Sequence, residues 1–149
     1  MNPAASQTSH ATSSILEKTL AVDFRRDGAG LVQCGVNFIR FWAFAGHNLT
    51  SSSAILGSRG KLQPFLCLGW VGNFAVVGTF DGHLYRFLGR QLDVAVPAHA
   101  GAVNSSSTTN EGICTGGKGG HVKVWSTRLD LRFSRELFGL GSVKPSTSS

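Results

Sequence analysis

Residues 112–118 are the part of this 149-residue chain that comes closest to a phosphate-binding loop. They fit the first seven positions of the pattern G-x-x-x-x-G-K, in which backbone amides and the lysine hold phosphate groups. The eighth position must be Ser or Thr to bind magnesium, and here it is Gly119. A phosphate loop must also open a helix, whereas residues 121–125 alternate as a strand does. The stretch therefore indicates a turn between strands rather than a nucleotide site.

The other side chains that could do chemistry form no recognisable active site. The eight acidic residues are scattered, and no nucleophile elbow is present. Cys34, Cys67 and Cys114 lie inside apolar strand patterns and lack the paired short spacings of a zinc site. We expect these cysteines to be reduced, buried thiols. The sequence therefore predicts a protein that is not an enzyme and that has no catalytic residue, cofactor or metal.

A strand–turn–strand pattern recurs along the chain. Residues 76–87 align without a gap on residues 114–125, at an offset of 38 residues. In a third copy, residues 32–42, the turn is two residues shorter and Trp42 lies 45 residues before Phe87. Periods of about 40 residues with one such unit per repeat are typical of propeller blades. The residues taken as blade markers are Gly35, Trp42, Gly78, Asp81, Gly82, Phe87, His99, Gly116, Gly120 and Trp125.

The elements that position these markers follow from simple geometry. A tight turn between two strands needs residues that accept positive φ or have no side chain, which accounts for the pairs at 81–82 and 119–120. A large aromatic residue at the end of each returning strand would fill the gap between neighbouring blades. One expected strand is unusual, because residues 103–109 contain only one large apolar residue. It is either an adapted edge strand or part of a poorly formed blade.

The pattern predicts an all-β chain of about three four-stranded antiparallel blades, which is an incomplete propeller. Such a chain leaves apolar blade faces and strand edges in water, so self-association through the open blade faces is possible. No apolar run is long enough to cross a membrane, and the N-terminal residues do not resemble a signal peptide. We expect a disordered lead-in at 1–14, a partial propeller at 15–138 and a disordered tail at 139–149. Within the propeller the expected blades are 15–48, 49–91 and 92–126, and residues 127–138 are expected to be the start of the next strand.

The chain is basic, with a formal net charge of +6. A surface of that sign favours acidic partners. The alternative is a solvated outer face, because residues 128–134 alternate polar and apolar side chains as a half-buried strand does. Nucleic acid is not the expected partner, since aromatic and basic residues do not interleave on one face. The possible basic contact surface consists of Lys118, Lys123, Arg128, Arg132 and Arg135.

Several residues resemble the markers of WD40 repeats. His99, followed by Ala100 and Gly101, matches the histidine of the repeat, and Trp125–Ser126 stands where the Trp-Asp pair is expected. The resemblance implies that His99 joins a strand hydroxyl in a hydrogen-bonded set. The turn aspartate of that set is missing, because Gly119 occupies its place. Asp81 keeps that place in the middle repeat, but no matching histidine precedes it.

More narrowly, the chain resembles the WD40 region of echinoderm microtubule-associated protein-like proteins. The matching pieces are LVQCGVNFIRFWAF, GSRGKLQPFLCLGW, GTFDGHLYRF, AHAGAV and CTGGKGGHVKVW, in the same order and spacing. The resemblance implies a non-catalytic protein of the cytoplasm and cytoskeleton that binds tubulin or microtubules, and other proteins through its propeller surface. The alternative is a generic WD40 interaction scaffold with no tubulin binding of its own.

Overall fold

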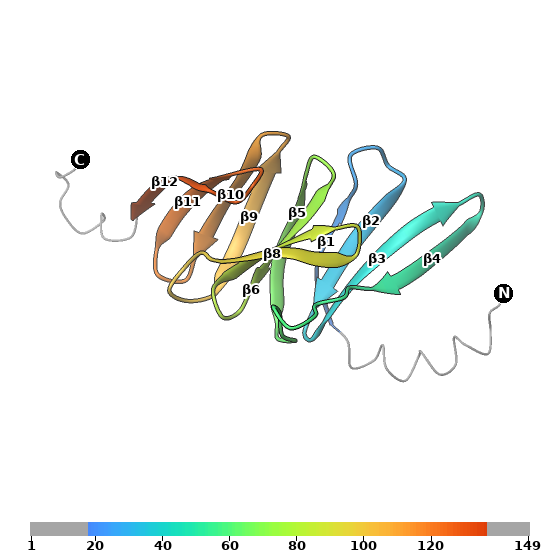
Figure 1. Ribbon diagram of the computed structural model, residues 1–149, viewed down its shortest axis with the longest axis horizontal. Coiled ribbons are helices and arrows are strands. Elements are labelled where there is room, and N and C mark those ends of the chain that lie inside the picture. The colour runs from blue at the N-terminus through green and yellow to red at the C-terminus, as the bar shows by residue number, and fades with distance from the viewer. Residues whose placement is uncertain (1–17, 137–149) are drawn as a thin grey trace.

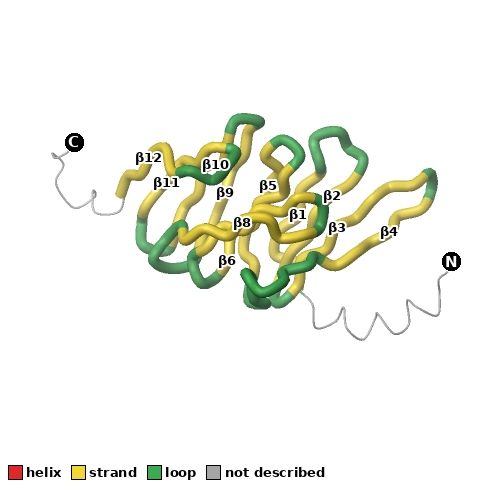
Figure 2. The backbone as a smooth tube through the Cα atoms, in the orientation of Figure 1, coloured by secondary structure: helices red, strands yellow, loops and turns green. Residues whose placement is uncertain are grey.

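The structure is a computed structural model that describes residues 18–136, which form three four-stranded antiparallel sheets (Figure 1). Between them these residues contain strands, turns and loops and no helix (Figure 2). The all-β class and the three blades expected from the sequence are confirmed. The disordered segments expected at 1–14 and 139–149 lie outside the described residues.

Each sheet is an up-and-down meander, with strands adjacent in sequence paired side by side. In Figure 1 the first and third sheets stand at the two ends of a row, with the second between them. The first sheet contains β1 (Thr19–Phe24), β2 (Gly30–Gly35), β3 (Phe38–Ala45) and β4 (Asn48–Ser53). The second sheet contains β5 (Phe65–Val71), β6 (Phe74–Thr79), β7 (His83–Leu88) and β8 (Gln91–Pro97). The third sheet contains β9 (Val103–Thr109), β10 (Gly112–Gly117), β11 (His121–Ser126) and β12 (Leu131–Glu136).

The sheets are offset by one strand from the expected blade boundaries. Strand β12 pairs with β11 in the third sheet, so the expectation that residues 127–138 begin the next unit needs correction. Strands β4 and β8 likewise close the first and second sheets. The cause is local, because Gly46 and Gly89 adopt φ of +63° and +62° and turn the chain straight back into a fourth strand.

The three sheets repeat the same strand register. Trp42, Phe87 and Trp125 lie opposite Leu31, Ala75 and Ile113, respectively, on the preceding strand. Gly78 lies opposite Leu84 on the next strand, and Gly116 lies opposite Val122. The same sequence positions therefore recur at the same places in each sheet.

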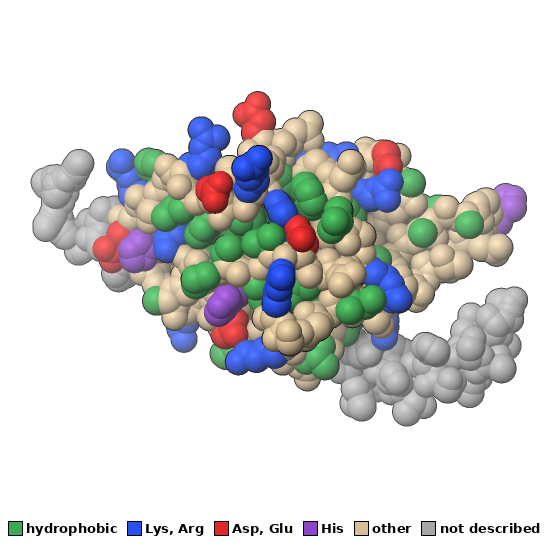
Figure 3. All heavy atoms as spheres, viewed as in Figure 1, with side chains coloured by type: hydrophobic (Ala, Val, Ile, Leu, Met, Phe, Trp, Pro, Cys, Tyr) green, Lys and Arg blue, Asp and Glu red, His purple; other side chains and the backbone are tan. Residues whose placement is uncertain are grey.

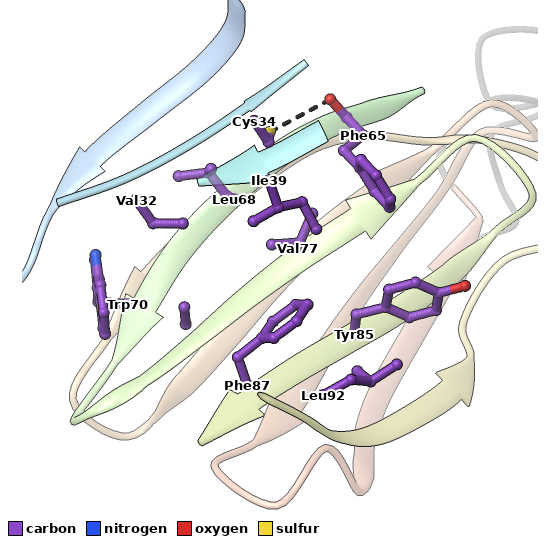
Figure 4. Close-up of a cluster of buried hydrophobic side chains, with 11 residues drawn as sticks. Val32, Cys34, Ile39, Phe65, Leu68, Trp70, Val77, Tyr85, Phe87 and Leu92 are labelled. Atoms are coloured by element: carbon purple, nitrogen blue, oxygen red, sulfur yellow. Dashed lines mark hydrogen bonds between the residues drawn. The ribbon is translucent and has the colours of Figure 1, made fainter. Parts of the chain in front are cut away.

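Two apolar clusters hold the sheets together face to face. The first joins the first and second sheets and includes Phe65, Trp70 and Phe87 (Figure 4). The ring of Phe41 packs against it, 5.7 Å from the ring of Phe87. The second cluster joins the second and third sheets around Trp125. Dispersion and the removal of apolar surface from water at these faces supply most of the stability of the row of sheets.

The expected buried thiols are present in both clusters. Cys34 donates to the carbonyl oxygen of Phe65 at 3.3 Å, and Cys67 donates to that of Val103 at 3.5 Å. Burial raises the pKa of the Cys34 thiol to about 12. This thiol therefore stays protonated and unreactive and behaves as a small apolar side chain. Cys114 is free and only half-buried.

The unusual strand β9 is an edge strand adapted to its neighbour rather than a defective one. It lies against β5 of the second sheet. Ser106 Oγ donates to the carbonyl oxygen of Leu68 at 3.3 Å, and a Cβ built on Gly69 would come within 2.4 Å of Thr108 Cγ2. The short polar side chains of β9 allow this close approach, which large apolar residues would prevent.

Truncation of Phe87 tests the packing between the first two sheets. The side chain is fully buried, so Phe87→Ala should lower the free energy of unfolding by about 3–5 kcal/mol through lost contacts and a cavity. Phe80→Ala is the matched control, because Phe80 is 58% exposed. Denaturant unfolding measures both variants. Equal effects at the two positions would contradict the packing described here.

Candidate interaction surface

The hydrogen-bonded set expected in the third sheet is present without its aspartate. Thr115 on β10 is buried, and its hydroxyl lies 2.8 Å from His99 Nε2 and 3.0 Å from Trp125 Nε1, which donates to it. The hydroxyl thus ties the connection before β9 to the two central strands of the sheet. Sequence reasoning predicted a strand hydroxyl but did not identify Thr115.

The turn between β6 and β7 is held by a different set of side chains. Thr79 Oγ1 donates to Asp81 Oδ1 at 2.6 Å, and His83 Nδ1 lies 3.1 Å from the same oxygen. Burial alone would raise the pKa of Asp81, but the hydrogen bonds from Thr79 and His83 outweigh it and lower that pKa. Asp81 is therefore an ionised, hydrogen-bonded turn residue.

Gln63 takes part in the same turn and was not found from the sequence. It is buried, and its Oε1 accepts the backbone N–H of Asp81 at 2.8 Å. Its Nε2 lies 3.3 Å from the hydroxyl of Tyr85. The connection before β5 has no histidine, and the side-chain amide of Gln63 holds the turn in its place. No motif or spacing in the sequence singles out this glutamine.

Gly82 joins the second sheet to the third. Its φ is +91°, and its carbonyl oxygen accepts the N–H groups of Ala98 and His99 at 2.8 and 2.9 Å. A Cβ at this position would lie 2.2 Å from the His99 carbonyl oxygen. Glycine is therefore required both by the backbone conformation and by the close approach of the neighbouring connection.

The predicted basic residues all belong to the third sheet but do not form one cluster. Lys118 lies in the β10–β11 turn, whereas Arg128 lies in the β11–β12 turn at the opposite end of the sheet. Arg132 and Arg135 are exposed on β12. Lys123 is engaged, because its Nζ donates to the carbonyl oxygen of Ala98 at 2.5 Å. On the face in Figure 3 basic and acidic side chains are interspersed over all three sheets.

One arginine outside the predicted set bridges two sheets. Arg86 on β7 donates to Asp93 Oδ2 at 2.5 Å and to the carbonyl oxygen of Thr127, in the third sheet, at 3.0 Å. Its guanidinium also lies 4.3 Å from the centre of the Phe74 ring. The arginine is largely buried, so its charge serves the contact between sheets rather than an external partner.

The inner strands of the three sheets border a polar groove of about 400 Å³. Arg26 reaches across it and donates to the carbonyl oxygen of Trp70 at 3.1 Å. The groove presents hydroxyl and carboxylate groups that could hydrogen-bond a peptide backbone. Its lining residues are Val22, Asp23, Phe24, Arg26, Leu68, Ser106, Ser107 and Thr108.

Within residues 18–136, no three His, Cys, Asp or Glu side chains come together as a metal site. In the same part of the chain, no helix is long and apolar enough to cross a membrane. The described residues present tied turns, a polar groove and one outer strand, β12, with several charged side chains.

Removal of the Thr115 hydroxyl tests the tied set. Thr115→Val keeps the shape but leaves the buried indole N–H of Trp125 without an acceptor, so the free energy of unfolding should fall by roughly 2 kcal/mol. Thr50→Val, on the exposed strand β4, should change it little. Denaturant unfolding measures both. An unchanged stability in Thr115→Val would show that the set does not matter.

The same set predicts a pH dependence. Partial burial, followed by the charges of Lys123 and His121, holds the pKa of His99 below its ordinary value of 6.5. The unfolded chain then binds the proton more readily, so the free energy of unfolding should fall as pH drops from about 7 to about 5. His99→Gln should make that fall smaller, whereas His47→Gln, in the exposed β3–β4 turn, should not. Urea titrations at several pH values measure this, and equal slopes in both variants would refute it.

Comparisons with known proteins now bear on this fold. No protein-family model matches the chain. The chain is 26% identical over 137 residues to echinoderm microtubule-associated protein-like 4 of Mus musculus and of Homo sapiens, which covers 81% of this chain and 14% of each relative. The chain therefore spans about a seventh of the length of these curated relatives.

Solved structures agree on the architecture. The WD40 β-propeller domain of Doa1 matches with a TM-score of 0.68 at 13% identity, over 79% of this chain and 40% of that one. The WD40 repeats of RRP9 match with a TM-score of 0.65 at 12% identity, over 79% and 38% of the two chains. At these identities the likeness shows the fold alone. Residues 18–136 thus have the fold of three WD40 propeller blades, and the chain is similar in sequence to echinoderm microtubule-associated protein-like 4.

Proposed function

We propose that this chain is a non-catalytic binding module that contributes to microtubule or tubulin binding and acts in the cytoplasm at the cytoskeleton. The observation that carries the proposal is the similarity to a microtubule-associated relative over 81% of the chain. The WD40 fold itself supports a role as a protein-interaction scaffold. Tubulin as the partner rests on the sequence similarity alone.

Charge supplies a physical route for this binding. The chain carries a formal net charge of +6, and Arg132 and Arg135 are exposed on β12, the outermost strand of the third sheet. A basic outer strand on a rigid sheet can attract the acidic tails of tubulin. Such contacts between exposed charges weaken with salt, since the Debye length is about 8 Å at physiological ionic strength.

A second candidate function is a WD40 scaffold that binds a different protein. Two observations favour it: the predicted basic residues are spread over both ends of the third sheet, and the inner-strand groove is lined by polar groups. Fold by itself does not choose between these partners. Competition between tubulin and other proteins for the chain would separate the two functions.

Co-sedimentation with microtubules tests the first proposal. The chain should pellet with microtubules at low salt and release as salt rises. The double variant Arg132→Glu/Arg135→Glu should bind about tenfold more weakly, because each reversal removes an attraction and adds a repulsion. The binding curve over a range of microtubule concentrations measures the change.

The matched control is Lys18→Glu/Lys61→Glu, which alters net charge equally on exposed lysines outside the third sheet. Because Lys61 lies 3.5 Å from Asp81, denaturant unfolding first checks that this variant remains folded. Equal weakening in both double variants would mean that net charge acts without a defined surface. A folded chain that fails to pellet even at low salt would remove microtubule binding and leave the scaffold function.

A further inference from the structure

The two contacts between sheets inside this chain follow one rule. In each contact, the face of one sheet that carries the aromatic residue ending its third strand packs on the face of its neighbour that carries a buried cysteine, together with larger residues such as Phe41 and Leu84. The second sheet presents Trp70 and Phe87 to the first, whose facing residues include Ala21 and Cys34. The third sheet presents Trp125 to the second, whose facing residues include Cys67. We call these the large face and the small face of a sheet.

The first sheet has a large face that no described sheet covers. The strand register places Phe24 and Trp42 at the positions that Trp70 and Phe87 occupy in the second sheet. Phe24 is 59% exposed, whereas Trp70 is 5% exposed. The ring of Phe24 stacks on Phe44, also exposed, at 6.3 Å. The apolar residues of this open large face are Val22, Phe24, Leu31, Trp42, Phe44 and Leu49, and Gln33 and Arg40 lie on the same face.

The third sheet has the matching open small face. The register places Ser107 at the position of Gly69 and Gly116 at the position of Gly78. At both glycines the adjoining sheet comes so close that a Cβ would lie within 2.8 Å of its side chains. On strands β9 to β11 the open small face consists of Ser105, Ser107, Cys114, Gly116, Val122 and Val124. Phe133 and Arg135 of the outer strand β12 lie on the same face, opposite Val124 and Val122.

The geometry points to a second copy of this chain as the occupant of both faces, with the large face of one copy on the small face of the other. The two open faces are the same two kinds that already meet twice within the chain, in the same register. The contact is heterologous, so it leads either to a ring or to an open filament.

A closed pair satisfies both faces of each copy. Two copies supply six sheets, which lies within the range of about four to eight blades over which propellers close. One copy covers 38–40% of its WD40 structural neighbours, so a pair approaches the length of one such chain. The pairing also removes from water the aromatic residues exposed on the first sheet.

Sedimentation velocity on the full chain over a range of concentrations tests the proposal. The wild type should form a dimer. Phe24→Asp should raise the dissociation constant by at least about tenfold, because a carboxylate would be buried among apolar groups. Phe80→Asp is the matched control, since Phe80 is 58% exposed but lies in the β6–β7 turn, and it should leave the constant unchanged.

The opposite face is tested with Ser107→Arg, which places a long side chain on the open small face and should also block pairing. Ser58→Arg, in the exposed connection between β4 and β5, is its control. An equimolar mixture of Phe24→Asp and Ser107→Arg chains should recover dimers, because one of the two contacts in the mixed ring joins two intact faces. Pairing of two large faces would instead leave Ser107→Arg fully dimeric.

Other results would overturn the proposal. A wild type that stays monomeric at high micromolar concentration excludes the pair. If that monomer is destabilised by Phe24→Asp more than by Phe80→Asp, the chain covers its own large face. Assemblies that grow without limit exclude the closed ring. A chain that does not bind microtubules would still be judged by these sedimentation results, because pairing does not depend on microtubule binding.

Discussion

The structure depends on the apolar packing of each sheet's face against the face of the neighbouring sheet. No single sheet of four short strands buries enough apolar surface to be stable by itself, because each face must find a partner. The aromatic residues at the ends of the third strands, Phe87 and Trp125, fill the space between neighbouring sheets. Where the second and third sheets meet, Gly69 and Gly78 set how closely the sheets approach.

The turns are tied so that this packing holds its register. Hydrogen bonds to Thr115 and to Asp81 fix two of the turns, and the Gly82 carbonyl links the second sheet to the connection that leads into the third. Arg86 adds a charged bridge at the same boundary. A platform held in this way presents its exposed loops and outer strands in fixed positions, which is what an interaction scaffold requires. The binding proposal uses the outer strand β12 and the pairing proposal uses the open end faces, and the two meet at Arg135, which lies opposite Val122.

The repeats could be predicted because the physics behind them is local. Alternation of apolar residues and tight turns at glycine pairs are visible within about twelve residues. The boundaries between the sheets were harder to predict from the sequence. Strand β12 was expected to begin a new unit, but the turn at residues 127–130 returns the chain to β11. Strand β9 also lacks the apolar alternation that predicts a strand. Its short polar side chains are instead suited to the close approach of β5, which the sequence does not show.

The sequence by itself determined the β class, the repeat and the unreactive character of the buried cysteines, because each of these follows from neighbouring residues along the chain. Only the tertiary structure decided which residues tie the turns, as Gln63 and Thr115 show. It also decided that Lys123 and Arg86 serve internal contacts while Arg132 and Arg135 remain exposed. The reason is that a hydrogen bond or an exposed charge depends on what lies across the sheet boundary, often 20 or more residues away, and no local pattern records that distance.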